Sequence, residues 1–193
     1  NDKVVDPAMG TGDFLTATMQ YRFKLDDKSV ISRVYGMDKD PQAFELAIIN
    51  MILNKDGQTY LREVDSIANP EIWKEEMGVA LCNPPFGAKT VETDINILRQ
   101  YDLGHLWVFK DNTWTMTDKI LDSQQLGILF IERCFKLLID GGKLGIILPE
   151  GYLCTASYGY VRKWILDNFK LIGLVELPRR IFLKSDADLR SNI

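Results

Sequence analysis

The chain of 193 residues has little histidine and little cysteine: one histidine, His105, and three cysteines with no CxxC spacing. An odd number of thiols without paired spacing is not typical of a disulfide framework or of a structural zinc site. A single histidine also argues against a Ser-His-Asp triad and against a histidine-based metal centre. We therefore predict no metal site, and reduced thiols as in the cytoplasm.

Long hydrophobic runs and a strong positive charge are also missing. No apolar run approaches the ~18 residues of a membrane-spanning helix, and residues 1–6 lack the apolar stretch of a secretory signal. Lys and Arg number 23 against 27 Asp and Glu, so the net charge of −4 gives no bulk attraction for phosphates. Residues 162–193 are more basic, with seven basic and four acidic side chains. They form either an edge that faces nucleic acid or a solvated surface.

The composition, 46% hydrophobic and 26% charged, describes one globular domain, and strand-like and helix-like segments alternate along it. The predicted strands are residues 4–5, 33–38, 60–64, 79–82, 144–148 and 171–177. The predicted helices are residues 14–23, a helix that starts at Pro41, and residues 124–139 and 158–169. This order predicts an α/β fold with a doubly wound, mostly parallel, Rossmann-like sheet that binds ligands at the carboxyl ends of its strands.

An insertion at about residues 88–122 has little periodicity. Its aromatic residues Trp107, Phe109 and Trp114 alternate around Asp111-Asn112, which predicts a hairpin. The hairpin aromatics either cover the protein's own surface or touch DNA or a partner subunit.

A glycine-bearing turn follows the first predicted strand. Gly10 and Gly12 allow backbone to approach a ligand closely, although glycines also serve turn geometry alone. A dinucleotide fingerprint requires a third glycine where this chain has Leu15. Asp6 and Asp13 flank the turn and would repel a pyrophosphate but attract a cation. S-adenosylmethionine has an ammonium and a sulfonium group and no phosphate.

Further acids end the next two predicted strands. Asp38 can accept hydrogen bonds from both ribose hydroxyls, as a carboxylate at this position does in nucleotide-binding folds, while Asp40 is placed to cap the helix that starts at Pro41. Asp65 either accepts a hydrogen bond from an adenine amino group or forms a turn or helix cap.

The segment Asn83-Pro84-Pro85-Phe86 follows an apolar strand. The prolines remove donors and stiffen the chain, which leaves the Asn83 side-chain oxygen and the Pro84 carbonyl as acceptors. An amino group held by two acceptors exposes its nitrogen lone pair in a third direction, which suits attack on a methyl group. Phe86 can stack on the base, and a duplex must release that base by flipping it out.

These motifs resemble those of DNA methyltransferases of the N6-adenine type, and specifically the modification subunit of type I restriction-modification systems. The matching segments are residues 6–15, 83–86, 129–134 and 141–151. The resemblance implies a methyltransferase-type sheet without its last strand, in a single catalytic domain cut from a longer chain. It also implies double-stranded DNA as substrate, a specificity subunit, and possible assembly with a restriction subunit.

Carried over residue by residue, the resemblance implies two sets of site residues. The catalytic set that holds the target adenine is Asn83, Pro84, Pro85 and Phe86. The set that binds S-adenosylmethionine is Asp6, Ala8, Gly10, Thr11, Gly12, Phe14, Asp38, Lys39 and Asp65.

Three alternatives remain. The two-acceptor logic also serves methyltransferases that act on a guanine amino group of ribosomal RNA or on a glutamine side chain. The chain is also compatible with a non-catalytic binding module that keeps the fold. Phe86 in place of tyrosine disfavours glutamine as the methyl acceptor, and Asp6-Pro7 favours DNA.

Overall fold

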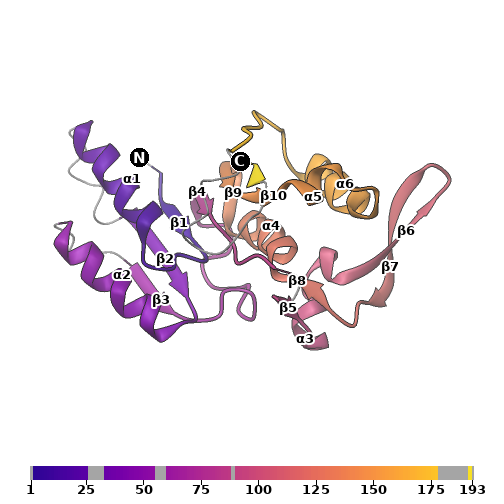
Figure 1. Ribbon diagram of the computed structural model, residues 1–193, viewed down its shortest axis with the longest axis horizontal. Helices are drawn as coiled ribbons and strands as arrows, with labels where there is room; N and C mark the ends of the chain where they lie inside the picture. The colour runs from indigo at the N-terminus through magenta and orange to yellow at the C-terminus, as the bar shows by residue number, and fades with distance from the viewer. Residues whose placement is uncertain (1, 26–32, 55–59, 88–89, 178–190, 193) are drawn as a thin grey trace. The chain divides into compact units, whose positions relative to one another are not determined.

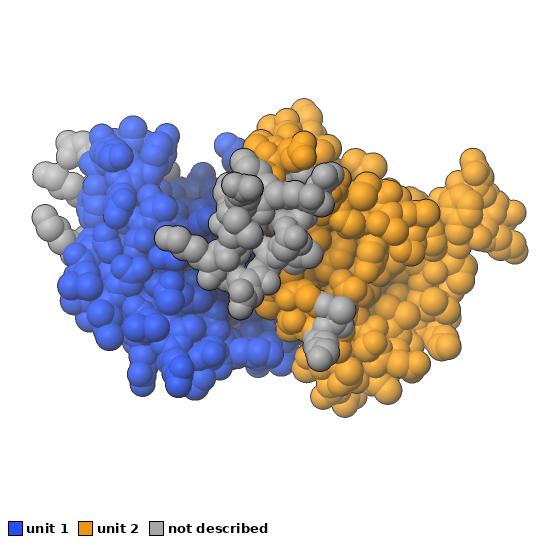
Figure 2. Space-filling model, in the orientation of Figure 1, with its two compact units in different colours: residues 1–83, 133–145 blue, residues 84–132, 146–193 orange. Residues whose placement is uncertain are grey.

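The computed structural model describes residues 2–25, 33–54, 60–87, 90–177 and 191–192. The chain divides into two compact units, coloured separately in Figure 2. Unit 1 contains residues 1–83 and 133–145, and unit 2 contains residues 84–132 and 146–193. The prediction of a single catalytic domain is not tested by this division and stays a prediction.

Unit 1 is built on a five-stranded sheet with the order β3-β2-β1-β4-β9 (Figure 1). Its strands are β1 (Val4–Asp6), β2 (Val34–Asp38), β3 (Tyr60–Glu63), β4 (Met77–Cys82) and β9 (Leu138–Ile146). Strand β1 pairs in parallel with both β2 and β4, and β2 pairs in parallel with β3. The strand order therefore reverses beside β1, which confirms the predicted doubly wound α/β sheet and marks the switch point where such folds bind ligands.

Helices α1 (Asp13–Lys24) and α2 (Pro41–Leu53) cover one face of this sheet. The core beneath them joins Met9, Leu15, Met19, Val34, Ala47 and Met51. Gly36 of β2 belongs to this face, because a Cβ there would overlap the side chains of Met9 and Leu15. The next residue of β2, Met37, lies on the opposite face of the strand and approaches Arg133 of helix α4 (Leu126–Leu137). Both faces of β2 are therefore covered.

Unit 2 contains the predicted insertion at residues 88–122, and the described part of this segment has regular structure beyond the predicted hairpin. The elements of unit 2, within and after the insertion, are β5 (Val91–Glu92), α3 (Ile95–Leu98), η2 (Asp102–Gly104), β6 (His105–Lys110), β7 (Thr113–Ile120), β8 (Gln124–Gln125), β10 (Leu148–Pro149), α5 (Glu150–Cys154), η3 (Ala156–Tyr158), α6 (Gly159–Asn168) and β11 (Ser191–Asn192). Their core gathers Leu103, Ile128, Ile131, Leu148, Tyr152, Val161 and Trp164.

The predicted hairpin is confirmed. Strands β6 and β7 pair antiparallel, and both turn residues, Asp111 and Asn112, have positive φ, as a tight two-residue hairpin turn requires. The rings of Trp107 and Trp114 lie 6.3 and 6.0 Å from the ring of Tyr160 in α6. Through these two rings the hairpin packs on its own unit.

Two predicted elements have wrong boundaries. Gln124 and Gln125 pair with β5 as strand β8, so helix α4 begins only at Leu126. The strand predicted at residues 144–148 is instead the end of β9, which already starts at Leu138, followed by the short β10.

The strand predicted at residues 171–177 is not formed. These residues are irregular apart from an isolated bridge at Glu176, and Ile172 is 84% exposed. Apolar residues alone do not make a strand, because its backbone also needs hydrogen-bonding neighbours. Within the part of the chain that the structure describes, no helix has the length and apolar character to cross a membrane.

Candidate functional site

The turn between β1 and α1 depends on two glycines in the left-handed region. Gly10 has φ +53° and Gly12 has φ +84°, values that side chains rarely adopt. A Cβ on Gly12 would also contact the Cβ of Ala47 at 3.5 Å, whereas a Cβ on Gly10 would meet nothing within 4 Å. The turn is packed closely on α2 at Gly12 and presents bare backbone at Gly10.

Asp38, at the carboxyl end of β2, holds this turn. Its Oδ2 accepts a hydrogen bond from the Gly10 amide at 2.8 Å, and its Oδ1 accepts one from the Asp40 amide at 2.9 Å. Asp40 in turn accepts from the amides of Gln42 and Ala43. Asp40 is therefore the N-cap of α2, as predicted, and Asp38 links the end of β2 to the glycine turn.

Asp6 ends β1 and is only 2% exposed. Its Oδ1 accepts a hydrogen bond from the Ala8 amide at 3.0 Å. Burial raises the pKa of Asp6 to about 7, with a smaller contribution from the nearby charge of Asp38, although the Ala8 amide acts in the opposite direction. Asp6 therefore exchanges a proton near neutral pH.

Two other predicted residues are Thr11, on the same turn, and Phe14, which follows the turn in α1. The Thr11 hydroxyl donates to Asp13 at 3.3 Å, and the Thr11 carbonyl accepts from the Asn50 side chain at 3.1 Å. Phe14 is the second residue of α1 and is partly buried. Side-chain contacts with α2 thus fix the far end of the turn.

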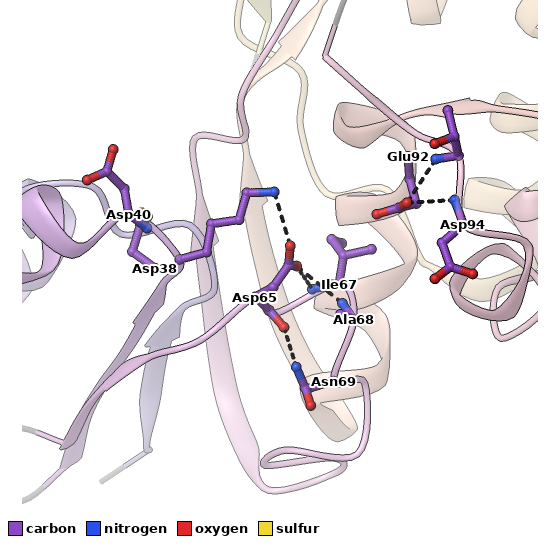
Figure 3. Close-up of polar contacts among 10 residues, drawn as sticks. Asp38, Asp40, Asp65, Ile67, Ala68, Asn69, Glu92 and Asp94 are labelled. Carbon is purple, nitrogen blue, oxygen red and sulfur yellow. Dashed lines mark hydrogen bonds and ion pairs between the residues drawn. The ribbon is translucent and has the colours of Figure 1, made fainter.

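Lys39 and Asp65 form an ion pair beside this edge of the sheet (Figure 3). The Lys39 Nζ lies 3.0 Å from Asp65 Oδ2. The other oxygen, Oδ1, accepts hydrogen bonds from the amides of Ile67 and Ala68 at 2.9 and 3.2 Å, and the Asp65 carbonyl accepts from Asn69. Asp65 therefore forms a turn, which is one of its two predicted roles. The other role, a contact with adenine, stays a prediction.

Arg133 supports the segment that follows Asp65, a role that the sequence analysis missed. Its fully buried guanidinium donates to the carbonyls of Ser66, Pro70 and Ile72 at 2.8, 3.1 and 2.7 Å. It also donates to the Ser66 hydroxyl at 3.0 Å. One side chain thus fixes the path of residues 66–72.

Asn83 directly follows β4, and its position in unit 1 is set by the pairing of β4 with β1. These strands run parallel, with Val5 opposite Ala80, so Asp6 and Asn83 lie at the same edge of the sheet. Cys82 is fully buried, whereas Asn83 is exposed. The Asn83 amide is therefore not enclosed in its own scaffold.

The rest of the predicted catalytic motif belongs to unit 2. Pro84 is buried, Pro85 is exposed and Phe86 is partly buried. The Phe86 carbonyl accepts a hydrogen bond from the Thr90 hydroxyl at 3.2 Å. Within unit 1, by contrast, hydrogen bonds join the glycine turn to Asp6 and Asp38 directly.

Solved structures with this fold include a methyltransferase subunit of a type I restriction-modification system from Streptococcus thermophilus. The two superpose with a TM-score of 0.72 at 22% identity, over 98% of this chain and 38% of that one. The likeness shows that this chain shares the fold of that methyltransferase subunit.

Sequence comparison gives relatives and a family. The chain is 23% identical over 190 residues to the methylase subunit of the type I restriction enzyme EcoEI of Escherichia coli, covering 94% of this chain and 35% of the relative. It is 25% identical over 198 residues to the methylase subunit of type I enzyme MjaVII of Methanocaldococcus jannaschii, covering 97% and 31%. It thus spans about a third of the length of these relatives. The family described as N-6 DNA Methylase matches residues 1–190, so the chain belongs to that family.

Proposed function

We propose that this chain is the catalytic part of a methyltransferase that transfers a methyl group from S-adenosylmethionine to N6 of adenine in DNA. Membership of the N-6 DNA Methylase family supports the reaction class. The observation that carries the proposal is the position of the exposed Asn83 beside the strand that leads into the acidic glycine turn, at one edge of the unit 1 sheet.

The residues of the turn fit the proposed cofactor. The carboxylates of Asp6 and Asp38 adjoin the turn, and the nearby Lys39 is neutralised by Asp65. This environment suits the ammonium and sulfonium groups of S-adenosylmethionine and disfavours a pyrophosphate. When bound, the cofactor supplies an electrophilic methyl group.

Each predicted cofactor residue has a role in this proposal. Asp38 accepts hydrogen bonds from the ribose and Asp65 accepts one from the adenine amino group. The methionine portion lies against the turn formed by Asp6, Ala8, Gly10, Thr11 and Gly12, while Phe14 and Lys39 border the site.

The catalytic motif orients the amino group of the target base. The Asn83 side-chain oxygen and the Pro84 carbonyl accept its two hydrogens, so the nitrogen lone pair points away from both acceptors. Pro85 stiffens the segment, and Phe86 stacks on the flipped-out base, a contact worth about 1–3 kcal/mol.

We also infer the setting of the enzyme. Two of its relatives are methylase subunits of type I restriction enzymes. This supports an enzyme that modifies double-stranded DNA in a hetero-oligomer with a specificity subunit and a restriction subunit. Such an assembly acts in the cytoplasm.

The test measures methyl transfer by the enzyme purified with its natural partner subunits. Tritiated S-adenosylmethionine is offered with unmethylated chromosomal DNA, ribosomal RNA or protein, and the labelled product is identified by mass spectrometry. We expect N6-methyladenine in DNA. We also expect Asn83→Ala to lower the rate by about 1,000-fold or more, because it loses an interaction that positions the nucleophile, while the affinity for S-adenosylmethionine stays within severalfold.

Other outcomes would contradict the proposal in distinct ways. Label in a guanine of ribosomal RNA or in glutamine would identify one of the alternative acceptors. Cofactor binding without transfer to any acceptor would identify a non-catalytic binding module.

A further inference from the structure

The ring of Phe86 lies beside a glycine in the first turn of α4. A Cβ added to Gly127 would lie 3.4 Å from Cδ1 of Phe86 and 3.0 Å from the hydroxyl of Tyr152. The second distance is shorter than a Cβ ordinarily allows, so an alanine would push on Tyr152 or on Phe86. Because residue 127 has no side chain, Phe86 and Tyr152 can both lie against the same stretch of helix.

Tyr152 is itself held in one orientation. It is 5% exposed, and its hydroxyl donates a hydrogen bond of 2.6 Å to Oε1 of Gln125. The Gln125 amide donates onward to the Tyr158 hydroxyl at 3.0 Å, and the rings of Tyr152 and Tyr158 meet edge to face at 5.0 Å. Burial raises the pKa of Tyr152 far above its usual value, so this hydroxyl stays a donor.

The backbone around Phe86 is anchored to the same part of the chain. The Phe86 carbonyl accepts from the Thr90 hydroxyl at 3.2 Å, and the Thr90 carbonyl accepts from the Leu126 amide at 3.0 Å. Val91 pairs with Gln125 in the sheet of β5 and β8. Residues 125–127 thus contact the loop of Phe86 on one hand and Tyr152 on the other.

We propose that Tyr152 is a positioning residue: hydrogen-bonded to Gln125 and packed at Gly127, it fixes the orientation of the Phe86 ring for the target adenine. This inference rests on the proposed function, because it needs Phe86 to contact the base. A Phe86 ring that is already held in place loses no rotational freedom when it stacks on the base. We therefore expect Tyr152 to raise the rate of methyl transfer. The cofactor-binding turn lies in unit 1, and its affinity is not affected.

The experiment is a double-mutant cycle in the enzyme purified with its natural partner subunits. Steady-state transfer from tritiated S-adenosylmethionine to unmethylated chromosomal DNA is measured for wild type, Tyr152→Phe, Phe86→Ala and the double variant. Tyr160→Phe is the matched control, because it also loses one hydroxyl, which accepts from Gln124 at 3.1 Å. Melting curves show whether each variant is folded at the assay temperature.

We expect Tyr152→Phe to lower kcat by about tenfold, the effect of losing one buried hydrogen bond, with KM for S-adenosylmethionine unchanged. Tyr160→Phe leaves kcat unchanged, and Tyr152→Phe has no further effect once Phe86 is alanine. Equal losses in both backgrounds, or a lower melting temperature with unchanged kcat, would overturn the inference. Absence of transfer by wild type would instead refute the proposed function, and the inference with it.

Discussion

The two units hold their candidate site residues by different means. In unit 1 the acids bind backbone amides: Asp6 and Asp65 bind amides two positions away, and Asp38 binds the Gly10 amide 28 positions earlier in the chain. In unit 2 the surroundings of Phe86 come from Gly127 and Tyr152, which are distant in the chain. Hydrogen bonds between carboxylates and backbone amides therefore hold the glycine turn, whereas packing of side chains forms the surroundings of Phe86.

The difference is clearest inside α4, where two adjacent buried charges serve the two units separately. The carboxylate of Glu132 accepts hydrogen bonds from the amides of Asp102 and Leu103 in unit 2, both at 2.9 Å. The guanidinium of Arg133 donates hydrogen bonds to three carbonyls within residues 66–72 of unit 1. One helix thus anchors a loop of each unit with neighbouring residues.

The largest expected effect comes from removing one of these anchors. Arg133→Met leaves the carbonyls of Ser66, Pro70 and Ile72 without their charged donor. We expect the free energy of unfolding to fall by about 3–5 kcal/mol. Denaturant unfolding measures the loss, and hydrogen exchange followed by mass spectrometry locates it in residues 66–72.

Glu132→Met is the companion variant, which should lower protection at residues 102–104 and leave residues 66–72 protected. If either substitution exposed both loops equally, the two anchors would not serve separate units.

A smaller effect is expected at Asp38. Asp38→Ala removes the acceptor for the Gly10 amide and the proposed acceptor for the ribose. Binding of S-adenosylmethionine should weaken by about 1.5–3 kcal/mol, as for other charge-assisted hydrogen bonds. Isothermal titration calorimetry measures the change, and Asp40→Ala serves as control because it removes only the cap of α2. Equal affinity for Asp38→Ala and wild type would exclude the assigned role.

Features set by nearby residues could be predicted from sequence, and features set by distant ones could not. The parallel strands, the cap at Asp40 and the hairpin turn each have a local signature, and all three are present. Residues 171–177 have the apolar character of a strand, but whether they pair depends on another segment. Helix α4 starts later than its apolar spacing suggested because Gln124 and Gln125 pair with β5.

Arg133 shows what the site prediction missed. Its acceptors lie at residues 66, 70 and 72, more than 60 positions earlier in the chain. A usable signal was present, since Arg133 follows Leu126, Leu129 and Phe130 at the spacing of the apolar face of the helix. A charge at such a position indicates a buried group that needs partners. The sequence does not reveal which partners those are.

The last prediction concerns Asp6, which ends β1 and leads into the glycine turn. Burial raises the pKa of Asp6 to about 7 in the folded protein, so between its unfolded pKa and that value the folded state binds more protons than the unfolded state. Stability contributed by this proton is therefore present at low pH and lost as the pH rises through the folded pKa. From about pH 5 to about pH 8 we expect a fall of about 2.6 kcal/mol in the free energy of unfolding.

Asp6→Asn cannot ionise, so it should remove this part of the pH dependence, which denaturant unfolding across the same range can measure. The Asn variant keeps an acceptor for the Ala8 amide, so we expect it to stay folded. An unchanged pH profile in Asp6→Asn would mean that another group titrates in this range.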